Sequence, residues 1–169
     1  MPQTMTSPQD LFVHELEDVY YAEQTLTKVL PKLVQEVSDS EFSEALEKHL
    51  DETKGHVANL EQVFEEIGAR AKGDKCPGID GIKEEHDTFI RENDPSHALL
   101  DLFVTGAAAR TEHYEIAAYT GLVEMAETLG SSKAAKLLQE NLKEEQAALK
   151  KVETISKRLL KDTAKAGSN

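Results

Sequence analysis

The sequence predicts an all-α protein, an antiparallel four-helix bundle made of two helix hairpins and a long crossover that carries a short extra helix. Apolar residues recur at three- and four-residue spacing through four long segments of the 169-residue chain, which is the period of helices with one buried face. Short polar breaks at 38–40 and 130–132 divide these segments into two pairs. No segment shows the sustained alternation of apolar and polar residues that a half-buried strand requires.

The first hairpin is expected between residues 8 and 68. Ser7 suits a helix cap and Pro8 a first helical position. The apolar stripe continues past Pro31, so this proline should kink the first helix without ending it. Gly68 should end the second helix. The two stripes comprise Leu16, Val19, Tyr20, Leu26, Leu30, Leu33, Val34 and Val37, then Phe42, Ala45, Leu46, Leu50, Val57, Leu60, Val63, Phe64 and Ile67.

The segment 69–96 differs in composition from the hairpins and is predicted as the crossover. Residues 69–81 carry glycines and prolines among lysines and are expected to form a loop, whereas 82–91 should form a short exposed helix. A third long helix should begin at Asp94-Pro95, with Asp94 as the cap, and run to Leu129, and a fourth should run to Leu159. We therefore divide the chain into a polar N-terminal segment (1–7), the bundle (8–160) and a flexible C-terminal tail (161–169).

The charge balance excludes several classes of partner. Acidic residues outnumber basic ones by 32 to 19, and the formal net charge is −13. Nucleic acids and anionic membranes bind clustered Lys and Arg, so neither is expected as a partner. No apolar run approaches the roughly 18 residues of a spanning helix, and the polar N-terminus does not resemble a signal peptide. Because Cys76 is the single cysteine, we expect a cytoplasmic protein without an intrachain disulfide or a thiolate metal cage.

The second hairpin resembles a copy of the first after a shift of 92 residues. This shift aligns Glu23 with Glu115 and Glu52 with Glu144, so each long helix has one matched glutamate. All four are expected on stripes that face the core. A buried carboxylate costs several kcal/mol unless it is paired, and Lys and Arg are nearly absent from these stripes. Protonation or a metal cation must therefore neutralise the glutamates.

Four inward glutamates fit a carboxylate-bridged dinuclear metal site. Such sites in four-helix bundles take one Glu from each of two helices and a Glu-x-x-His from each of the other two. This chain departs from the pattern, because Gly55 and Ala147 stand where the histidines would be. His56 and Glu112, each one turn from a matched glutamate, can complete the two ligand sets. The predicted metal ligands are Glu23, Glu52, His56, Glu112, Glu115 and Glu144.

Two metal ions are expected at this site, with iron as the first choice and manganese as the alternative. His49 lies one turn before Glu52 and is interpreted as a core residue or as a hydrogen-bond partner of a ligand. For His56, the roles of ligand and of core histidine stay open. Cys76 and His86 are assigned to the loop or the surface.

Several motifs within residues 8–160 are specific enough to compare with known families. They are Asp-Val-Tyr-Tyr-Ala-Glu-Gln at 18–24, His-Leu-Asp-Glu-Thr at 49–53, Lys-Cys-Pro-Gly-Ile-Asp-Gly at 75–81, Glu-His-Tyr-Glu-Ile-Ala-Ala-Tyr at 112–119 and Glu-Glu at 144–145. In these motifs the chain resembles the YciE/YciF family of bacterial ferritin-like stress proteins. The resemblance implies a ferritin-like bundle, a homodimer and a superfamily whose carboxylates often hold di-iron. It also implies a link to osmotic or general stress, without an established reaction. The family commonly carries Gln at the position of His56, which shifts weight toward the glutamates as ligands.

Two functions are compatible with these observations. In the first, a di-iron or related centre reacts with peroxide, oxygen or Fe(II) during stress. In the second, the chain is a non-enzymatic stress or interaction protein whose metal, if any, is structural; the missing Glu-x-x-His histidines favour this alternative. A ferritin cage is disfavoured, because the crossover carries its own helix and the tail is too short for another ordered one.

Overall fold

The computed structural model describes residues 4–166 and contains five helices and no strand in that range. The helices are α1 (Pro8–Glu36), α2 (Ser40–Glu66), α3 (Pro77–Asn93), α4 (His97–Thr128) and α5 (Ser132–Ala166). This confirms the predicted fold, a ferritin-like antiparallel four-helix bundle with an extra helix in the crossover. In the part of the chain described, no helix combines the length and the apolar composition that crossing a membrane demands.

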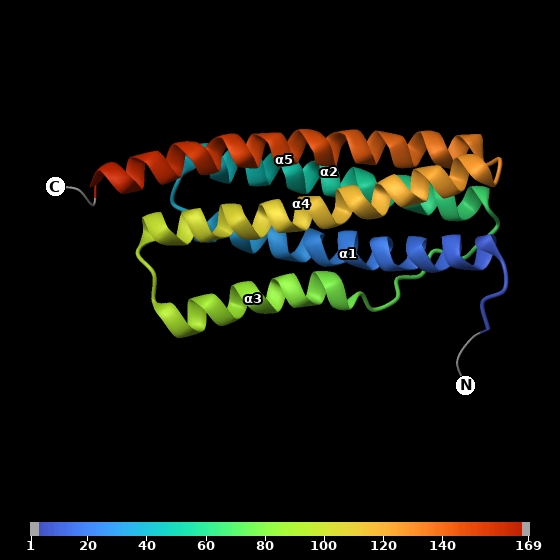
Figure 1. The fold of residues 1–169 in the computed structure, drawn as a ribbon, viewed down its shortest axis with the longest axis horizontal. Coiled ribbons are helices and arrows are strands. Elements are labelled where there is room, and N and C mark those ends of the chain that lie inside the picture. Colours follow the sequence, from blue (N-terminus) through green and yellow to red (C-terminus); the bar gives the residue numbers. More distant parts are fainter. Residues whose placement is uncertain (1–3, 167–169) are drawn as a thin grey trace.

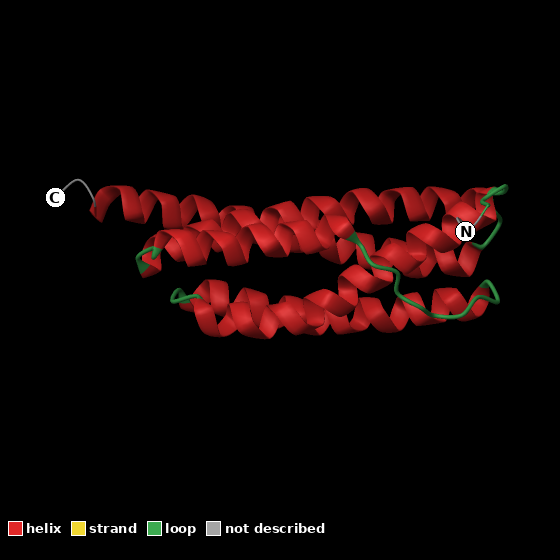
Figure 2. Ribbon diagram, turned by 90° about the horizontal axis from the view of Figure 1, so that it is seen from below, coloured by secondary structure: helices red, strands yellow, loops and turns green. Residues whose placement is uncertain are grey.

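The two hairpins, α1–α2 and α4–α5, lie side by side along a common long axis (Figure 1). Helix α5 packs against both α4 and α2, and α1 packs against α2 and α4. After α2 the crossover loop runs along the bundle to about its middle, where α3 begins and packs on the outside against α4 (Figure 2). Each of the four long helices therefore has one face toward a shared interior.

The predicted break between α1 and α2 is held in place by a buried carboxylate from α4. Asp101 accepts hydrogen bonds from the backbone N–H groups of Ser38 and Asp39, at 2.9 and 3.0 Å, and from the Ser38 hydroxyl at 2.7 Å. Asp39 in turn caps α2 by accepting from the Phe42 N–H at 2.9 Å. Helix α1 continues through Pro31 to Glu36, so the proline does not end it.

Helix α3 begins at Pro77, earlier than the predicted residue 82. A proline suits the first helical position, and the Cys76 sulfur accepts from the Ile79 N–H at the helix start. Cys76 is buried, with its Sγ 2.9 Å from the Tyr114 hydroxyl oxygen. Cys76 thus lies at the end of the loop, as predicted, but not on the surface, because it caps α3 and contacts Tyr114 of α4.

Two other boundaries also differ from the prediction. Asp94 adopts a left-handed conformation (φ 41°) and ends α3, so it does not cap α4, which begins at His97 with Ser96 before it. Helix α5 continues to Ala166, which makes residues 161–166 of the predicted tail helical; this stretch contains Lys and Ala, which favour helices. Residues 167–169 of that tail and 1–3 of the N-terminal segment lie outside the described range.

Apolar side chains fill the bundle in two clusters, separated along every long helix by buried polar residues. One cluster includes Phe12, Leu16, Leu60, Phe64, Tyr119, Leu122 and Leu138. The other includes Leu26, Leu30, Phe42, Leu46, Val104, Val152 and Ile155. The polar layer between them comprises Glu23, His49, Thr53, His56, Glu112, Glu115, Asn141 and Glu145. A polar layer in the middle of an apolar bundle is where a functional site is expected.

Candidate metal centre

Two groups of metal-ligating side chains meet in the polar layer. His49, Glu112, Glu115 and Glu145 form the first group, and Glu23, His56 and Glu145 form the second. Within each group, one ligand atom from every residue lies within 4.8 Å of the others. All of these residues are buried, and Glu145 belongs to both groups.

Helical spacing explains why these side chains converge. On α2, His49 and His56 are seven residues apart and therefore share a face. On α4, Glu112 and Glu115 are three residues apart and also point to the same side. Because α1 and α5 supply the remaining carboxylates, the centre is assembled from all four helices of the bundle.

Four of the six predicted ligands lie together in the interior, namely Glu23, His56, Glu112 and Glu115. Glu52 lies at the edge of the centre with 18% of its side chain exposed. There it pairs with Lys48, and one of its oxygens is 3.6 Å from Nδ1 of His49. The structure therefore places Glu52 beside the first group and not within it.

The prediction that Glu144 faces the core is wrong, because its side chain is 50% exposed while that of Glu145 is fully buried. Adjacent residues on a helix are separated by about 100°, so one register step decides which glutamate enters. Glu145 lies on the same helical stripe as Leu138 and Leu142. This spacing is the sequence signal that indicates Glu145 as the buried residue. Glu144 contacts the centre from outside, with Oε2 2.9 Å from His56 Nε2.

His49, interpreted from the sequence as a core residue or as a partner of a ligand, lies among the donor atoms of the first group. Its Nε2 is 3.3 Å from Glu112 Oε1 and 3.8 Å from Glu145 Oε2. Neither ring nitrogen has a hydrogen-bond partner, although both are buried. A buried imidazole with two unpaired nitrogens is available as a ligand.

His56 and Glu145 form an internal ion pair. Nδ1 of His56 lies 2.9 Å from Glu145 Oε1 and 3.2 Å from Glu23 Oε1. Burial lowers the pKa of His56, but the contacts with Glu145 and Glu23 outweigh it and raise the pKa to about 11. For Glu145 the directions are reversed: burial raises the pKa, but the contacts with Glu112 and His56 outweigh burial and lower the pKa to about 2. Without a metal, imidazolium and carboxylate neutralise each other.

The other three carboxyl groups favour the protonated form. Burial is the main cause that raises the pKa of Glu23, and it raises the pKa values of Glu112 and Glu115 well above their usual range. The negative charge of Glu145 acts in the same direction on all three. Both oxygens of Glu115, and one each of Glu23 and Glu112, are buried without a hydrogen-bond partner.

A chain of hydrogen bonds leads from Glu23 toward the surface. The Tyr119 hydroxyl donates to Glu23 Oε1 at 2.5 Å and accepts from the Asn141 amide at 3.1 Å. Asn141 accepts in turn from the amide of the partly exposed Asn59 at 2.8 Å. Glu23 is thereby fixed in orientation on one side, while its second oxygen stays unpaired toward the interior.

This donor set fits metal cations. Carboxylate and imidazole ligands suit divalent first-row metals such as iron, manganese and zinc. The buried, unpaired oxygens and nitrogens are the atoms that a cation would satisfy, because such groups otherwise carry a desolvation penalty of about 1–3 kcal/mol each. The residues present can therefore hold metal ions, and they form two groups that share the carboxylate of Glu145.

Comparisons with known proteins agree with the fold and the motifs. The family model described as Domain of unknown function (DUF892) matches residues 7–165, nearly the whole chain. The chain belongs to the DUF892 family. Among its relatives is Protein YciF of Escherichia coli (strain K12), which is 42% identical over 144 residues, covering 85% of this chain and 86% of that protein. The resemblance seen in the sequence motifs is confirmed.

Solved structures of similar proteins extend the comparison. The E. coli stress protein YciF has a TM-score of 0.88 at 38% identity, covering 93% of this chain and 99% of that one. YcfI from Rhodopseudomonas palustris, provisionally assigned as a structural protein, has a TM-score of 0.87 at 38% identity, covering 91% and 98%. A Xanthomonas campestris protein shares the fold, with a TM-score of 0.74 at 16% identity over 96% of this chain and 100% of that one.

Proposed function

We propose that this DUF892 protein is a stress-associated metalloprotein that holds two metal ions, iron first and manganese second, in a carboxylate centre acting on peroxide, oxygen or Fe(II). The observation that carries the proposal is the pair of buried donor groups that share Glu145. Unpaired buried oxygens and nitrogens in both groups support it, because a bound cation is the partner that they lack. The name of the E. coli relative as a stress protein supports the stress association.

In this proposal Glu145, which belongs to both donor groups, would help to hold both ions. His49, Glu112 and Glu115 would hold one ion, and Glu23 and His56 the other. A pair of redox-active ions supplies electron transfer to or from small oxygen species and Fe(II).

The chain's own side chains would manage the protons. His56 must lose its proton before it can act as a ligand, and the carboxyl groups with raised pKa values must lose theirs. The proton to be lost is the one on Nδ1, the nitrogen that faces Glu145 and Glu23. Glu144 lies against the opposite nitrogen, Nε2, where it would accept a hydrogen bond from the remaining N–H and hold the ring in place. Tyr119 holds Glu23 in place by donating to one of its oxygens.

Counting metals per chain tests the proposal. The protein would be purified without chelator from iron-supplemented cells and analysed by elemental analysis, with an expected content of about two ions per chain. Glu145→Ala should lose the metal, whereas Glu153→Ala, an exposed change on the same helix, should retain it. A wild-type protein that stays metal-free after anaerobic addition of Fe(II) would refute the dinuclear centre.

A second function is favoured by the ion pair of His56 with Glu145, which neutralises part of the site without metal. In this alternative the protein is a non-enzymatic stress or interaction protein whose metal is structural, in line with the provisional assignment of the R. palustris relative. Metal would then raise the melting temperature without repeated turnover of peroxide or Fe(II). Repeated turnover at stoichiometric metal would exclude this alternative.

We also propose a cytoplasmic homodimer. Sedimentation equilibrium of the purified chain measures the assembly directly. A monomer or a large cage would contradict it.

A further inference from the structure

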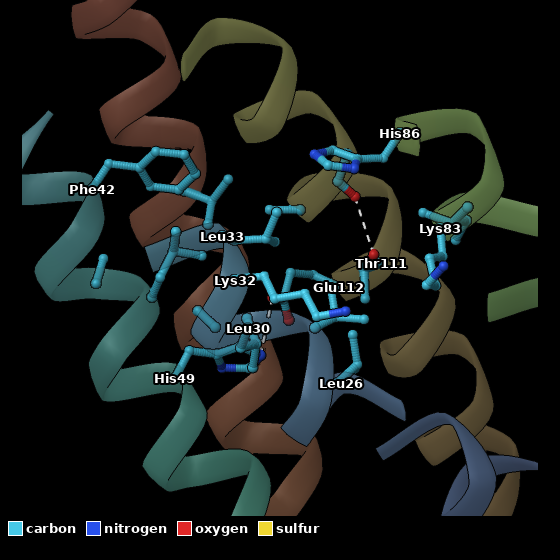
Figure 3. A pocket seen from close by; sticks show the side chains of 18 of the residues that line it. Leu26, Leu30, Lys32, Leu33, Phe42, His49, Lys83, His86, Thr111 and Glu112 are labelled. Atoms are coloured by element: carbon cyan, nitrogen blue, oxygen red, sulfur yellow. Dashed lines mark hydrogen bonds and ion pairs between the residues drawn. The ribbon is translucent and has the colours of Figure 1, made fainter. Parts of the chain in front are cut away.

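A cavity of about 460 Å³ opens beside the candidate metal centre. All five helices contribute to its lining, and its walls are mostly apolar. Leu30 and Leu33 come from α1 and Phe42 from α2 (Figure 3), and Ala108 comes from α4. This volume lies within the range of about 300–1,000 Å³ that is usual for small-molecule sites. The cavity is therefore large enough for an organic molecule with an apolar body.

The cavity reaches the metal centre at one point. His49 and Glu112 line it, and both side chains are more than nine-tenths buried. Both His49 ring nitrogens and Glu112 Oε2 lack a hydrogen-bond partner. One part of the wall is thus formed by donors of the first ligand group, and a molecule in the cavity lies next to that group.

The remaining charged groups of the lining come from residues of α1, α2, α3 and α5. Most of them are paired: Lys48 with Glu52, Lys83 with Asp87, Lys151 with Glu41, and His86 with Glu36. Among the described residues, no carboxylate lies within ion-pairing distance of Lys32. Lys32 is exposed, and Figure 3 shows its side chain extended among the residues that line the cavity. It is the cation of this lining that remains available to a ligand.

We propose that the cavity binds a single-chain alkyl carboxylate, with the carboxylate at Lys32 and the alkyl chain along the apolar walls toward His49 and Glu112. The opposite orientation would place the ligand's negative charge against the carboxylate of Glu52, which lines the cavity beside His49. Burial of the alkyl chain supplies the affinity, and Lys32 selects an anion on a chain of net charge −13. Binding requires no metal, so the inference goes beyond the proposed function and can fail or succeed independently of it.

Titration calorimetry of the full-length, metal-free protein with decanoate tests the proposal. One molecule per cavity should bind, and hexanoate should bind more weakly because each buried CH₂ tightens binding about fourfold. Decyltrimethylammonium, which has the same chain and the opposite charge, should bind more weakly than decanoate. Absence of binding for hexanoate, decanoate and hexadecanoate would overturn the proposal.

Two variants test the assigned orientation and position. Lys32→Glu replaces the attraction at the carboxylate with a repulsion, so decanoate should bind about tenfold more weakly. Lys28→Glu, the same charge change at an exposed residue one turn earlier on α1 and outside the cavity, should leave the affinity unchanged. Ala108→Phe should place a phenyl ring in the path of the alkyl chain and weaken binding. Equal weakening by the two lysine variants, or full affinity in Ala108→Phe, would contradict the assignment.

Discussion

Replacing Glu145 by Gln removes the carboxylate that neutralises His56 in the metal-free protein, at almost constant side-chain volume. Both side chains are fully buried, and the ion pair spans 2.9 Å. Removing one partner of a buried ion pair typically costs about 3–5 kcal/mol. Glu23, 3.2 Å from the same nitrogen, keeps part of the compensation, so we expect a loss near the lower limit, about 3 kcal/mol.

The matched control is Glu144→Gln, which changes the neighbouring residue and the contact with the other ring nitrogen of His56. Glu144 is half-exposed, although its oxygen lies at the same distance of 2.9 Å. Ion pairs open to water contribute about 0–1 kcal/mol, so this variant should lose no more than that. The comparison isolates burial as the cause, because the charge removed and the partner are the same.

Urea unfolding of chelator-treated protein, followed by circular dichroism at 222 nm, measures both variants. A loss of about 3 kcal/mol corresponds to a decrease in melting temperature of roughly 6–12 °C in a chain of this size. Equal free energies of unfolding for Glu145→Gln and Glu144→Gln would refute the assignment of Glu145 as the interior carboxylate. A larger loss for Glu144→Gln would restore the register predicted from the sequence repeat.

Three further predictions address the centre and its supports. The metal-free protein should lose stability as pH rises above 4.5, because the three buried glutamates with raised pKa values favour folding in their protonated form. Mn(II) should therefore raise the melting temperature more at about pH 8 than at about pH 5.5. Asp101→Ala should lower the free energy of unfolding, measured by chemical unfolding, by about 1.5–3 kcal/mol, because three hydrogen bonds to a buried carboxylate are lost. The same change at the exposed Asp51 should alter that free energy by about 0.5 kcal/mol or less. In α3, Gly78→Ala would place Cβ 2.6 Å from the Tyr114 ring and should lower the free energy of unfolding by about 1–3 kcal/mol. Gly81→Ala meets open space and should raise that free energy by about 0.5–1 kcal/mol. Equal effects of the two changes on the melting temperature would contradict the close contact of Gly78 with Tyr114.

Helical periodicity was sufficient to predict the bundle and the layer that holds the centre. Glu23 and Glu115 were identified because a charged residue interrupts a stripe whose other members are apolar. On α5 the same method failed, because Glu144 and Glu145 are adjacent and the internal repeat selected the wrong one. The repeat is not exact at this position: Glu145 aligns with Thr53, a buried hydroxyl on α2. The neighbouring histidines of α2 supply the metal-ligating groups that Thr53 does not.

Other features depended on contacts between distant parts of the chain. The burial of Cys76 follows from the packing of α3 on α4 and from its contact with Tyr114, neither of which has a local sequence signal. The hydrogen bonds from the break at 38–39 to Asp101 join residues more than sixty positions apart. Proline and a capping residue indicated that a helix starts near 94–96, but the left-handed conformation of Asp94 makes this residue the end of α3.

The position of Glu145 in both donor groups has a thermodynamic consequence for any cations that they hold. If the proposed centre holds two cations, His56 and Glu145 would have to exchange their mutual contact for the first cation, which would change the charge around the second donor group. Occupancy of one group is thereby coupled to occupancy of the other, with a coupling free energy that acts equally in both directions. Under the proposed function, a titration of the protein with metal should therefore resolve two unequal stepwise affinities.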